Sequence, residues 1–166
     1  MSSFNRRLFL LSLTGLAACG FTPAYGPQGG AQALQGRISL PVPKDRADFL
    51  LNQRLDEKFG HADNAPFLLT TTISTEEQGI GQTVDGKTTR FHLIGSVNWA
   101  LRDAVTDTIL LSGSEKNFTG YSTTGSTVAT VAAQRDATAR LLTILADQIA
   151  DQIIAQAADI GRDAQA

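Results

Sequence analysis

The stretch Thr89–Arg102, TRFHLIGSVNWALR, decides the fold class of this chain. Every second position in it carries a bulky apolar side chain or, once, a glycine: Phe91, Leu93, Gly95, Val97, Trp99 and Leu101. A helix would scatter these residues around its circumference, whereas a strand places all of them on one face. The stretch therefore predicts a long strand with one buried face.

The eight residues before this strand, GQTVDGKT (Gly81–Thr88), match the phosphate-loop pattern G-x-x-x-x-G-K-[ST]. A working phosphate loop leads into a helix whose N-terminus holds the phosphates, but here a strand follows. The preceding segment FLLTTTISTEEQ, residues 67–78, is also typical of a strand. Residues 79–87 are therefore predicted to be a hairpin loop that turns at Asp85-Gly86, and we do not expect a nucleotide ligand.

A short strand and a helix are predicted before the hairpin. Residues 36–42, GRISLPV, suit a strand that ends at its prolines. Asp45 is a suitable N-cap, and Gly60 a suitable end, for a helix between them. The apolar residues of this helix recur at every fourth position: Ala47, Leu51, Leu55 and Phe59. One face of the helix is therefore expected to be buried.

Another strand and a long helix are predicted after the hairpin. Residues 108–118, TILLSGSEKNF, continue the sheet, and a helix runs from about Ser126 to Ala158 without Gly or Pro. Its apolar stripe comprises Ala137, Leu141, Leu145, Ile149, Ile153 and Ala157, widened by Ile144. Because the helix begins Ala-rich and becomes Leu/Ile-rich, we expect its firmest packing in the second half.

The element order β-α-β-β-β-α predicts a single α+β domain over residues 36–160, followed by a tail, 161–166. We expect a two-layer sandwich, with an about four-stranded, mostly antiparallel sheet and two helices on one face. At 42% hydrophobic and 18% charged residues, the composition is that of an ordinary globular protein. The net charge of -2, without a Lys/Arg stripe, argues against nucleic acid as a partner.

The first 19 residues, MSSFNRRLFLLSLTGLAAC, have the shape of a secretory signal. The basic pair Arg6-Arg7 precedes an apolar run from Leu8 to Ala18. This run is too short to cross a hydrocarbon core of about 30 Å as a helix. A basic pair of this kind suits either the Sec or the twin-arginine route of export. We therefore predict a cleaved signal peptide, residues 1–18.

The end of this signal, Leu16-Ala17-Ala18-Cys19, resembles a bacterial lipobox. The resemblance implies cleavage after Ala18 and a diacylglyceryl group on the Cys19 thiol. Cys19 is the only cysteine of the chain and has no internal disulfide partner. Two or three acyl chains anchor a protein far longer than one chain does. Residues 19–35 are expected to be an irregular, acylated tether.

The residues from Cys19 to Gly26, CGFTPAYG, are close to the CGFxPLYG opening of the LPS-assembly lipoprotein (LptE) family of Gram-negative bacteria. Ala24 departs from the usual Leu. The segment AAQRDATARLLTILADQIADQI of the last predicted helix is also similar to that family, as is the order of elements. The resemblance therefore covers the whole chain as architecture and the N-terminal octet residue by residue.

This resemblance implies a non-enzymatic role at the periplasmic face of the outer membrane. Family members sit in the lumen of a large outer-membrane β-barrel, act as its plug and assembly factor, and help deliver lipopolysaccharide to the outer leaflet. The implied partners are that barrel, lipopolysaccharide and the membrane, with the lipid on Cys19 in place of any cofactor. The rival hypothesis is an envelope lipoprotein that binds a small ligand or another envelope complex without entering a barrel. A cavity of several hundred cubic ångströms would favour it.

Lys87 and Arg90, near the predicted hairpin tip, are the candidates for contact with lipopolysaccharide or the barrel. A cationic side chain at a loop tip can meet a phosphate group directly. The alternative is an ordinary exposed cross-strand pair, with Arg90 opposite Glu76 or Glu77.

Patterns typical of catalytic or metal sites are missing from the sequence. His61, in a predicted linker, and His92, on the polar side of a strand, have no companion at metal-ligand spacing. Glu76 and Glu77 are neighbours in a strand, so they point to opposite faces and cannot flank one substrate. No serine stands in a G-x-S-x-G nucleophile elbow. We therefore expect neither an enzyme nor a metal site.

Overall fold

The computed structural model describes residues 26, 30–123, 125–157 and 160. The predicted signal peptide, the cleavage position Ala18 and the lipidation position Cys19 lie outside the described residues. In chain order the elements are α2 (Gly30–Leu34), β1 (Ile38–Ser39), α3 (Arg46–Phe59), β2 (Phe67–Gln82), β3 (Thr88–Asp103), β4 (Ile109–Ser122) and α4 (Thr127–Ala155).

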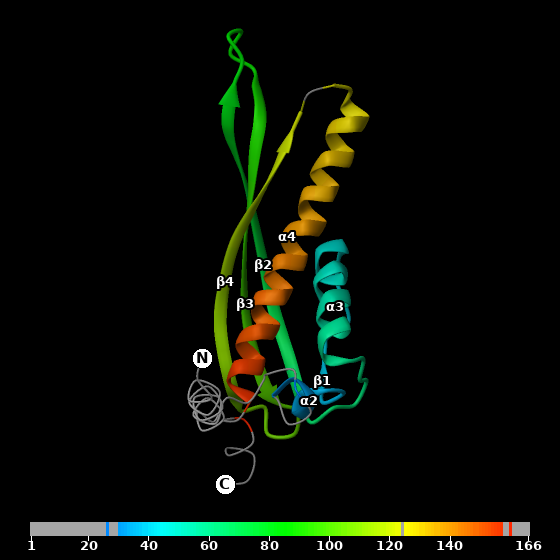
Figure 1. Ribbon diagram of the computed structural model, residues 1–166. Coiled ribbons are helices and arrows are strands. Elements are labelled where there is room, and N and C mark those ends of the chain that lie inside the picture. The colour runs from blue at the N-terminus through cyan, green and yellow to red at the C-terminus, as the bar shows by residue number, and fades with distance from the viewer. Residues whose placement is uncertain (1–25, 27–29, 124, 158–159, 161–166) are drawn as a thin grey trace, which may run out of the picture.

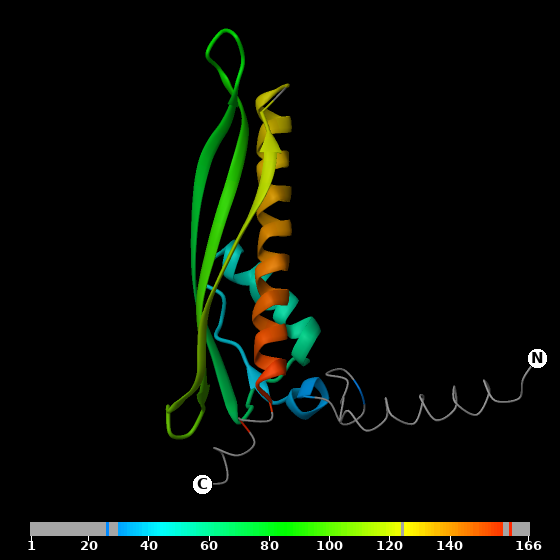
Figure 2. The ribbon, with the colours of Figure 1, turned by 60° about the vertical axis from the view of Figure 1, so that its left-hand side comes forward.

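The strands form a 4-stranded sheet in the order β1-β2-β3-β4. β1 is parallel to the start of β2, with Ile38 opposite Phe67, and the other neighbours are antiparallel. The two long helices, α3 and α4, lie on the same side of the sheet (Figure 1, Figure 2). The structure therefore confirms the predicted α+β fold, including the mostly antiparallel sheet with helices on one face.

The alternating residues of β3 face the helices as predicted. Leu93, Val97, Trp99 and Leu101 are buried in the core shared with α4. Gly95 stands in the same row, and a Cβ built there would lie 2.8 Å from Leu141 Cδ2 and 3.1 Å from Leu145 Cδ1. The missing side chain lets α4 cross close to the middle of the sheet.

The ends of α3 are capped as the sequence predicts. The Asp45 carboxylate accepts a hydrogen bond from the Asp48 amide at 2.9 Å, which satisfies a donor of the first turn. At the other end, the Gly60 amide donates to Asp56 O at 2.8 Å, with Gly60 at a φ of 78°. Leu51, Leu55 and Phe59 then form the buried face.

α4 packs most firmly in its second half, which confirms the expectation from its composition. It begins after the N-cap Ser126, whose hydroxyl accepts from the Ala129 amide at 3.2 Å. Its buried residues start only at Ala137 and are Ala137, Leu141, Leu142, Leu145, Ala146, Ile149, Ala150, Ile153 and Ile154. Ile144 does not widen this stripe. It is 37% exposed, because it lies on the flank of α4 that turns away from both sheet and α3.

Residues 30–34, expected to belong to an irregular tether, form the helix α2. Ala31 and Leu34 are buried in the core. A Cβ built at Gly30 would lie 2.5 Å from Ile154 O, so the glycine permits close contact with the end of α4. The tether prediction is wrong for this segment because burial of its apolar side chains outweighs the local preference of a Gly-rich sequence for irregular structure.

Candidate functional site

The β2–β3 hairpin ends in a tight loop that projects beyond the start of α4 (Figure 1). The Thr83 amide donates to Lys87 O at 2.9 Å, and the Gly86 amide donates to Thr83 O at 2.9 Å. Gly86 has a φ of 76°, in the left-handed region that glycine adopts without strain. The predicted turn at Asp85-Gly86 is confirmed, and the phosphate-loop match leads into a strand rather than a helix.

Lys87 and Arg90 both lie exposed at this hairpin tip. Among the described residues, no carboxylate forms an ion pair with either side chain. The Arg90 side chain passes over Gly81, where a Cβ would lie 3.2 Å from Arg90 Cβ. Both charges are therefore available to an external anion.

The expected pairing of Arg90 with Glu76 or Glu77 is wrong. Arg90 pairs with Gly81 on one side and with Ser122 on the other. The two glutamates stand opposite Ile94 and Leu93 instead. The reason is that β2 continues through Gln82, with register shifts at Gly79 to Gly81, so the hairpin is longer than the sequence suggested.

Glu77 is held on the helix-facing side of the hairpin, away from Arg90. Gln134 Nε2 of α4 donates to its carboxylate. Burial, together with a hydrogen bond to Glu77, raises the pKa of Tyr121, whose ring stacks on Phe91 with centroids 5.4 Å apart. Because Phe91 faces the helices, the adjacent Arg90 points to the uncovered face.

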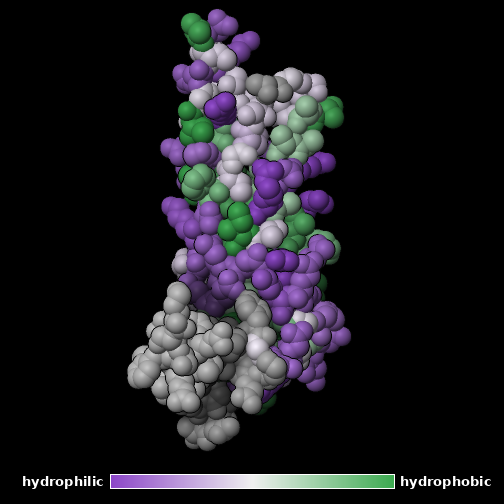
Figure 3. Space-filling view, in the orientation of Figure 1, coloured by the Kyte–Doolittle hydropathy of each residue, from purple (hydrophilic) through white to green (hydrophobic). Residues whose placement is uncertain are grey.

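Apolar side chains are also exposed at this end of the molecule. Ile80 and Val84 of the hairpin, and Val128 of α4, are exposed. Figure 3 shows hydrophobic surface beside hydrophilic surface at this end of the molecule. The hairpin tip, which we define as residues 79–90, is therefore both cationic and apolar.

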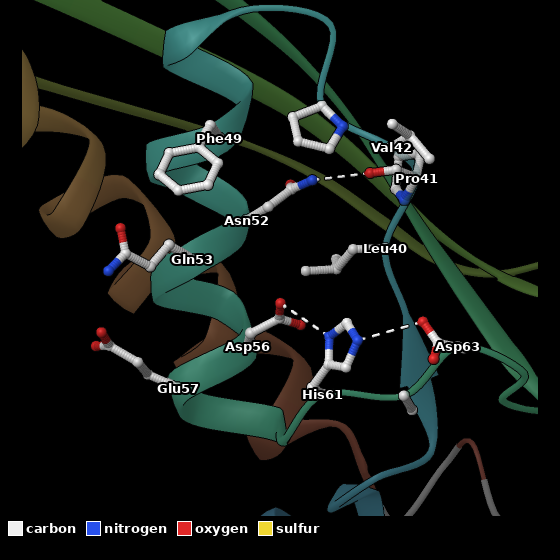
Figure 4. A pocket seen from close by; sticks show the side chains of 12 residues that line it. Leu40, Pro41, Val42, Phe49, Asn52, Gln53, Asp56, Glu57, His61 and Asp63 are labelled. Atoms are coloured by element: carbon white, nitrogen blue, oxygen red, sulfur yellow. Dashed lines mark hydrogen bonds and ion pairs between the residues drawn. The ribbon is translucent and has the colours of Figure 1, made fainter.

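A second candidate site, which is concave, lies at the outer side of α3. We call it the acidic cleft. Its volume is about 760 Å³. Three segments line it: the extended chain after β1, the outer face of α3, and the turn that follows α3 (Figure 4). The lining residues are Leu40, Pro41, Val42, Pro43, Phe49, Asn52, Gln53, Asp56, Glu57, His61, Ala62 and Asp63.

His61 lies between two carboxylates at one end of the acidic cleft (Figure 4). Its Nδ1 is 3.3 Å from Asp56 Oδ2, and its Nε2 is 3.2 Å from Asp63 Oδ1. The hydrogen bond with Asp56, followed by the charges of Asp56 and Asp63, raises the pKa of His61. The imidazole thus acts as a bridge that is cationic over a wider pH range than a free histidine.

The acidic cleft was missed in the sequence because its parts are remote from one another. The spacing of Phe49, Gln53 and Asp56 could have indicated a surface site, because these residues lie together on a face of α3 that differs from its buried face. The prolines of the segment 40–43 were read only as the end of a strand. Nothing in the sequence placed this segment beside α3.

The two histidines occupy different surroundings. His92 lies beside Phe118 on the uncovered face of the sheet, with ring centroids 4.7 Å apart. Within the described ranges, no group of three His, Cys, Asp or Glu residues is arranged to hold a metal ion. No helix in the described part of the chain combines the length and apolarity needed to cross a membrane.

This is an α+β protein with a sheet covered on one face, a projecting cationic hairpin and an acidic cleft. A family model described as lipopolysaccharide-assembly (LptE) matches residues 33–153. The chain belongs to this family. The family suggested by the sequence is therefore confirmed by the match over residues 33–153, which supports the terms lipoprotein, lipopolysaccharide assembly and cell envelope.

Solved structures with this fold come from several bacteria. A candidate lipoprotein from Caulobacter crescentus CB15 is 26% identical, with 78% of this chain and 96% of that chain covered and a TM-score of 0.63. A minor lipoprotein from Acinetobacter baumannii is 22% identical, with coverage of 74% and 94% and a TM-score of 0.54. Rare lipoprotein B from Shewanella oneidensis is 16% identical, with coverage of 75% and 96% and a TM-score of 0.56. The last two establish likeness of fold alone. A comparison with curated proteins gave no match.

Proposed function

We propose that this protein is an outer-membrane lipoprotein that plugs, and helps to assemble, the β-barrel that exports lipopolysaccharide. A lipid on Cys19, added with cleavage after Ala18, holds the domain at the periplasmic face of the outer membrane. The acylated segment begins at Cys19 and extends as far as α2. The single domain follows it to residue 160, and residues 161–166 form a tail. The protein acts without catalysis, and its only prosthetic group is the lipid.

The observation that carries this proposal is the composition of the hairpin tip. Lys87 and Arg90 have no carboxylate partner among the described residues, and Ile80 and Val84 are exposed beside them. Lipopolysaccharide carries anionic phosphates next to acyl chains. A tip that offers both ammonium or guanidinium groups and apolar side chains matches that amphiphile, or an equivalent surface of the barrel.

The uncovered face of the sheet suits the polar lumen of a large barrel. Small hydroxyl and amide side chains dominate its central part: Thr70, Thr72, Ser74, Ser96, Asn98, Ser112 and Ser114. Such side chains can exchange hydrogen bonds with a polar barrel wall or with ordered water. A packed core on the opposite face keeps the domain rigid while this face is in contact.

Affinity purification of the native, detergent-extracted protein tests the plug role. We expect a large outer-membrane β-barrel to be recovered with it. The Cys19→Ala variant should lose acylation and fractionate with soluble periplasmic protein. The control Thr143→Ala, at an exposed position of α4, should behave as the native chain does. Recovery of no large barrel would contradict the plug role, and full acylation of Cys19→Ala would contradict the anchor.

A second candidate function is favoured by the acidic cleft. With a volume of about 760 Å³, it has the size of a ligand site, which fits an envelope lipoprotein that binds a ligand or another complex without entering a barrel. Native protein that carries a bound small molecule and no barrel would favour this second function over the first.

A further inference from the structure

Acceptor atoms outnumber donors among the side chains of the acidic cleft, where the donors are the amides of Asn52 and Gln53 and the ring of His61. Asp56, Glu57 and Asp63 contribute carboxylates, which accept but do not donate. Pro41 and Pro43 have no amide hydrogen, so the extended segment offers mainly carbonyl oxygens. A ligand that complements this surface must therefore bring several donors.

Asn52 places one more acceptor at the base of the cleft. Its side chain is a polar group that is only 7% exposed. Its Nδ2 donates to Pro41 O at 2.9 Å, which ties α3 to the extended segment (Figure 4). No described residue donates a hydrogen bond to its Oδ1. The Oδ1 atom of this amide can therefore accept a hydrogen bond from a donor outside the protein.

The charge of the cleft selects a cation. Glu57 is already paired with Arg54 at 2.8 Å. Against Asp56 and Asp63, His61 is the one positive group among the lining residues, so the cleft stays negative whether or not the imidazole is protonated. Lipid phosphates and other anions are therefore repelled. This polarity is opposite to that of the hairpin tip, where Lys87 and Arg90 stand without carboxylate partners among the described residues.

The other end of the cleft is apolar. The side chain of Leu40 extends from the segment 40–43 toward α3, and Phe49 and Val42 lie beyond it (Figure 4). Phe49 is 54% exposed and Val42 is 86% exposed, so both side chains offer apolar surface at this end of the cleft. An exposed aromatic ring beside carboxylates can also stack with a planar guanidinium group.

We propose that the acidic cleft binds a polypeptide segment in which an arginine is adjacent to a bulky apolar residue. The guanidinium group carries five donors in a planar fork, and so it can bind a carboxylate with two parallel hydrogen bonds and still reach Asn52. The apolar neighbour covers Phe49 and Val42. A polypeptide suits the site better than a small molecule because the cleft is open along one side, whereas small ligands are largely enclosed by their sites. The cleft is separate from the hairpin tip, so this binding does not depend on what the tip contacts.

A labelled synthetic peptide, acetyl-Gly-Leu-Arg-Phe-Gly-amide extended by a fluorophore, is the probe. Its binding to the full chain in detergent is measured by fluorescence anisotropy at low ionic strength. Replacement of its arginine by citrulline should weaken binding about tenfold, as loss of a close charge pair does. The variant Asp56→Asn/Asp63→Asn should show a loss of similar size, and Phe49→Ser a smaller one.

The matched control is Glu76→Gln/Asp85→Asn, which removes two negative charges from exposed positions remote from the cleft. Its affinity should stay within about twofold of the native value, since screened charges at that distance contribute little. Equal affinity for the citrulline peptide, or for Asp56→Asn/Asp63→Asn, overturns the proposal. So does displacement of the peptide by free guanidinium at an equal concentration, because that result indicates a site for small cations.

Discussion

Arg54 of α3 and Asp147 of α4 are joined by two hydrogen bonds, from Nε to Oδ1 at 2.9 Å and from Nη2 to Oδ2 at 3.2 Å. Lys58 lies 3.1 Å from the same carboxylate, and Glu57 lies 2.8 Å from Arg54. The hydrogen bond to Asp147, then that to Glu57, raise the pKa of Arg54. This cluster fixes α3 against α4, and it thereby holds the wall of the acidic cleft in place.

Asp147→Asn should destabilise the fold, because two partly buried cations lose the charge that they share. We expect a decrease of about 1 kcal/mol in the free energy of unfolding, the size of a charged hydrogen bond discounted for partial exposure. Urea unfolding followed by circular dichroism measures it. The control Asp136→Asn removes an exposed helical pair with Arg140 and should cost less than about 0.5 kcal/mol. Equal effects would show that the α3–α4 contact does not depend on charge.

The same carboxylate predicts a dependence of stability on pH. Partial burial alone would raise the pKa of Asp147, but hydrogen bonds from Arg54 and Lys58 outweigh it, and the pKa is lowered. A group with a lowered pKa in the folded state stabilises fully above its unfolded pKa of about 3.9, and this contribution is lost as the pH falls through the folded value. Native protein should therefore lose stability more steeply than Asp147→Asn below about pH 4. Parallel curves for the two proteins in acid would refute this assignment.

Gly95→Val should disturb the contact between sheet and α4. The first added carbon already falls 2.8 Å from Leu141 Cδ2, so α4 or its leucines must move. We expect a loss of about 2 kcal/mol, as for other overpacked cores. Gly120→Ala is the control, because a Cβ there has its nearest neighbour at 3.7 Å. Thermal unfolding of the two variants should separate them clearly, and a stable Gly95→Val would mean that α4 lies farther from the sheet.

Ile153→Ala and Ile144→Ala test how α4 faces the core. Ile153 is fully buried, whereas Ile144 is 37% exposed. Truncation at residue 153 should cost about 2–5 kcal/mol, and at residue 144 less than about 1 kcal/mol, because only the first opens a cavity. Chemical denaturation measures both. Similar losses of stability in the two variants would show that Ile144 is buried as Ile153 is.

Lys87→Ala/Arg90→Ala should leave folding nearly unchanged, since neither side chain has a carboxylate partner among the described residues. If the hairpin tip meets lipopolysaccharide phosphates, binding of detergent-dispersed lipopolysaccharide should weaken about tenfold through loss of two charge-assisted contacts. Lys44→Ala/Arg46→Ala, which removes two exposed cations before and at the start of α3, is the matched control. Unchanged binding by the double variant would exclude the tip as the phosphate contact.

Much of the fold could be predicted because local patterns agree with the tertiary structure. The alternation in β3, the caps Asp45 and Ser126, and the turn at Asp85-Gly86 each follow from the conformational preferences of a few adjacent residues. The resemblance of residues 19–26 to a known family was equally local. Two misjudged features depend on residues that are remote in the sequence. α2 forms because its apolar side chains are buried against α4, and the exposure of Ile144 depends on which sides of α4 the sheet and α3 pack against.

The amino-acid pattern alone decided the types and order of the elements from β1 to α4, because periodicity and capping are properties of short segments. Tertiary structure alone decided that β1 lies parallel to β2, that Arg90 stands opposite Gly81 rather than a glutamate, and that residues 40–43 meet α3 to form the acidic cleft. Strand register depends on bulges, and a cleft depends on segments brought together by the packing of a shared core. Neither is encoded in any one stretch of the chain.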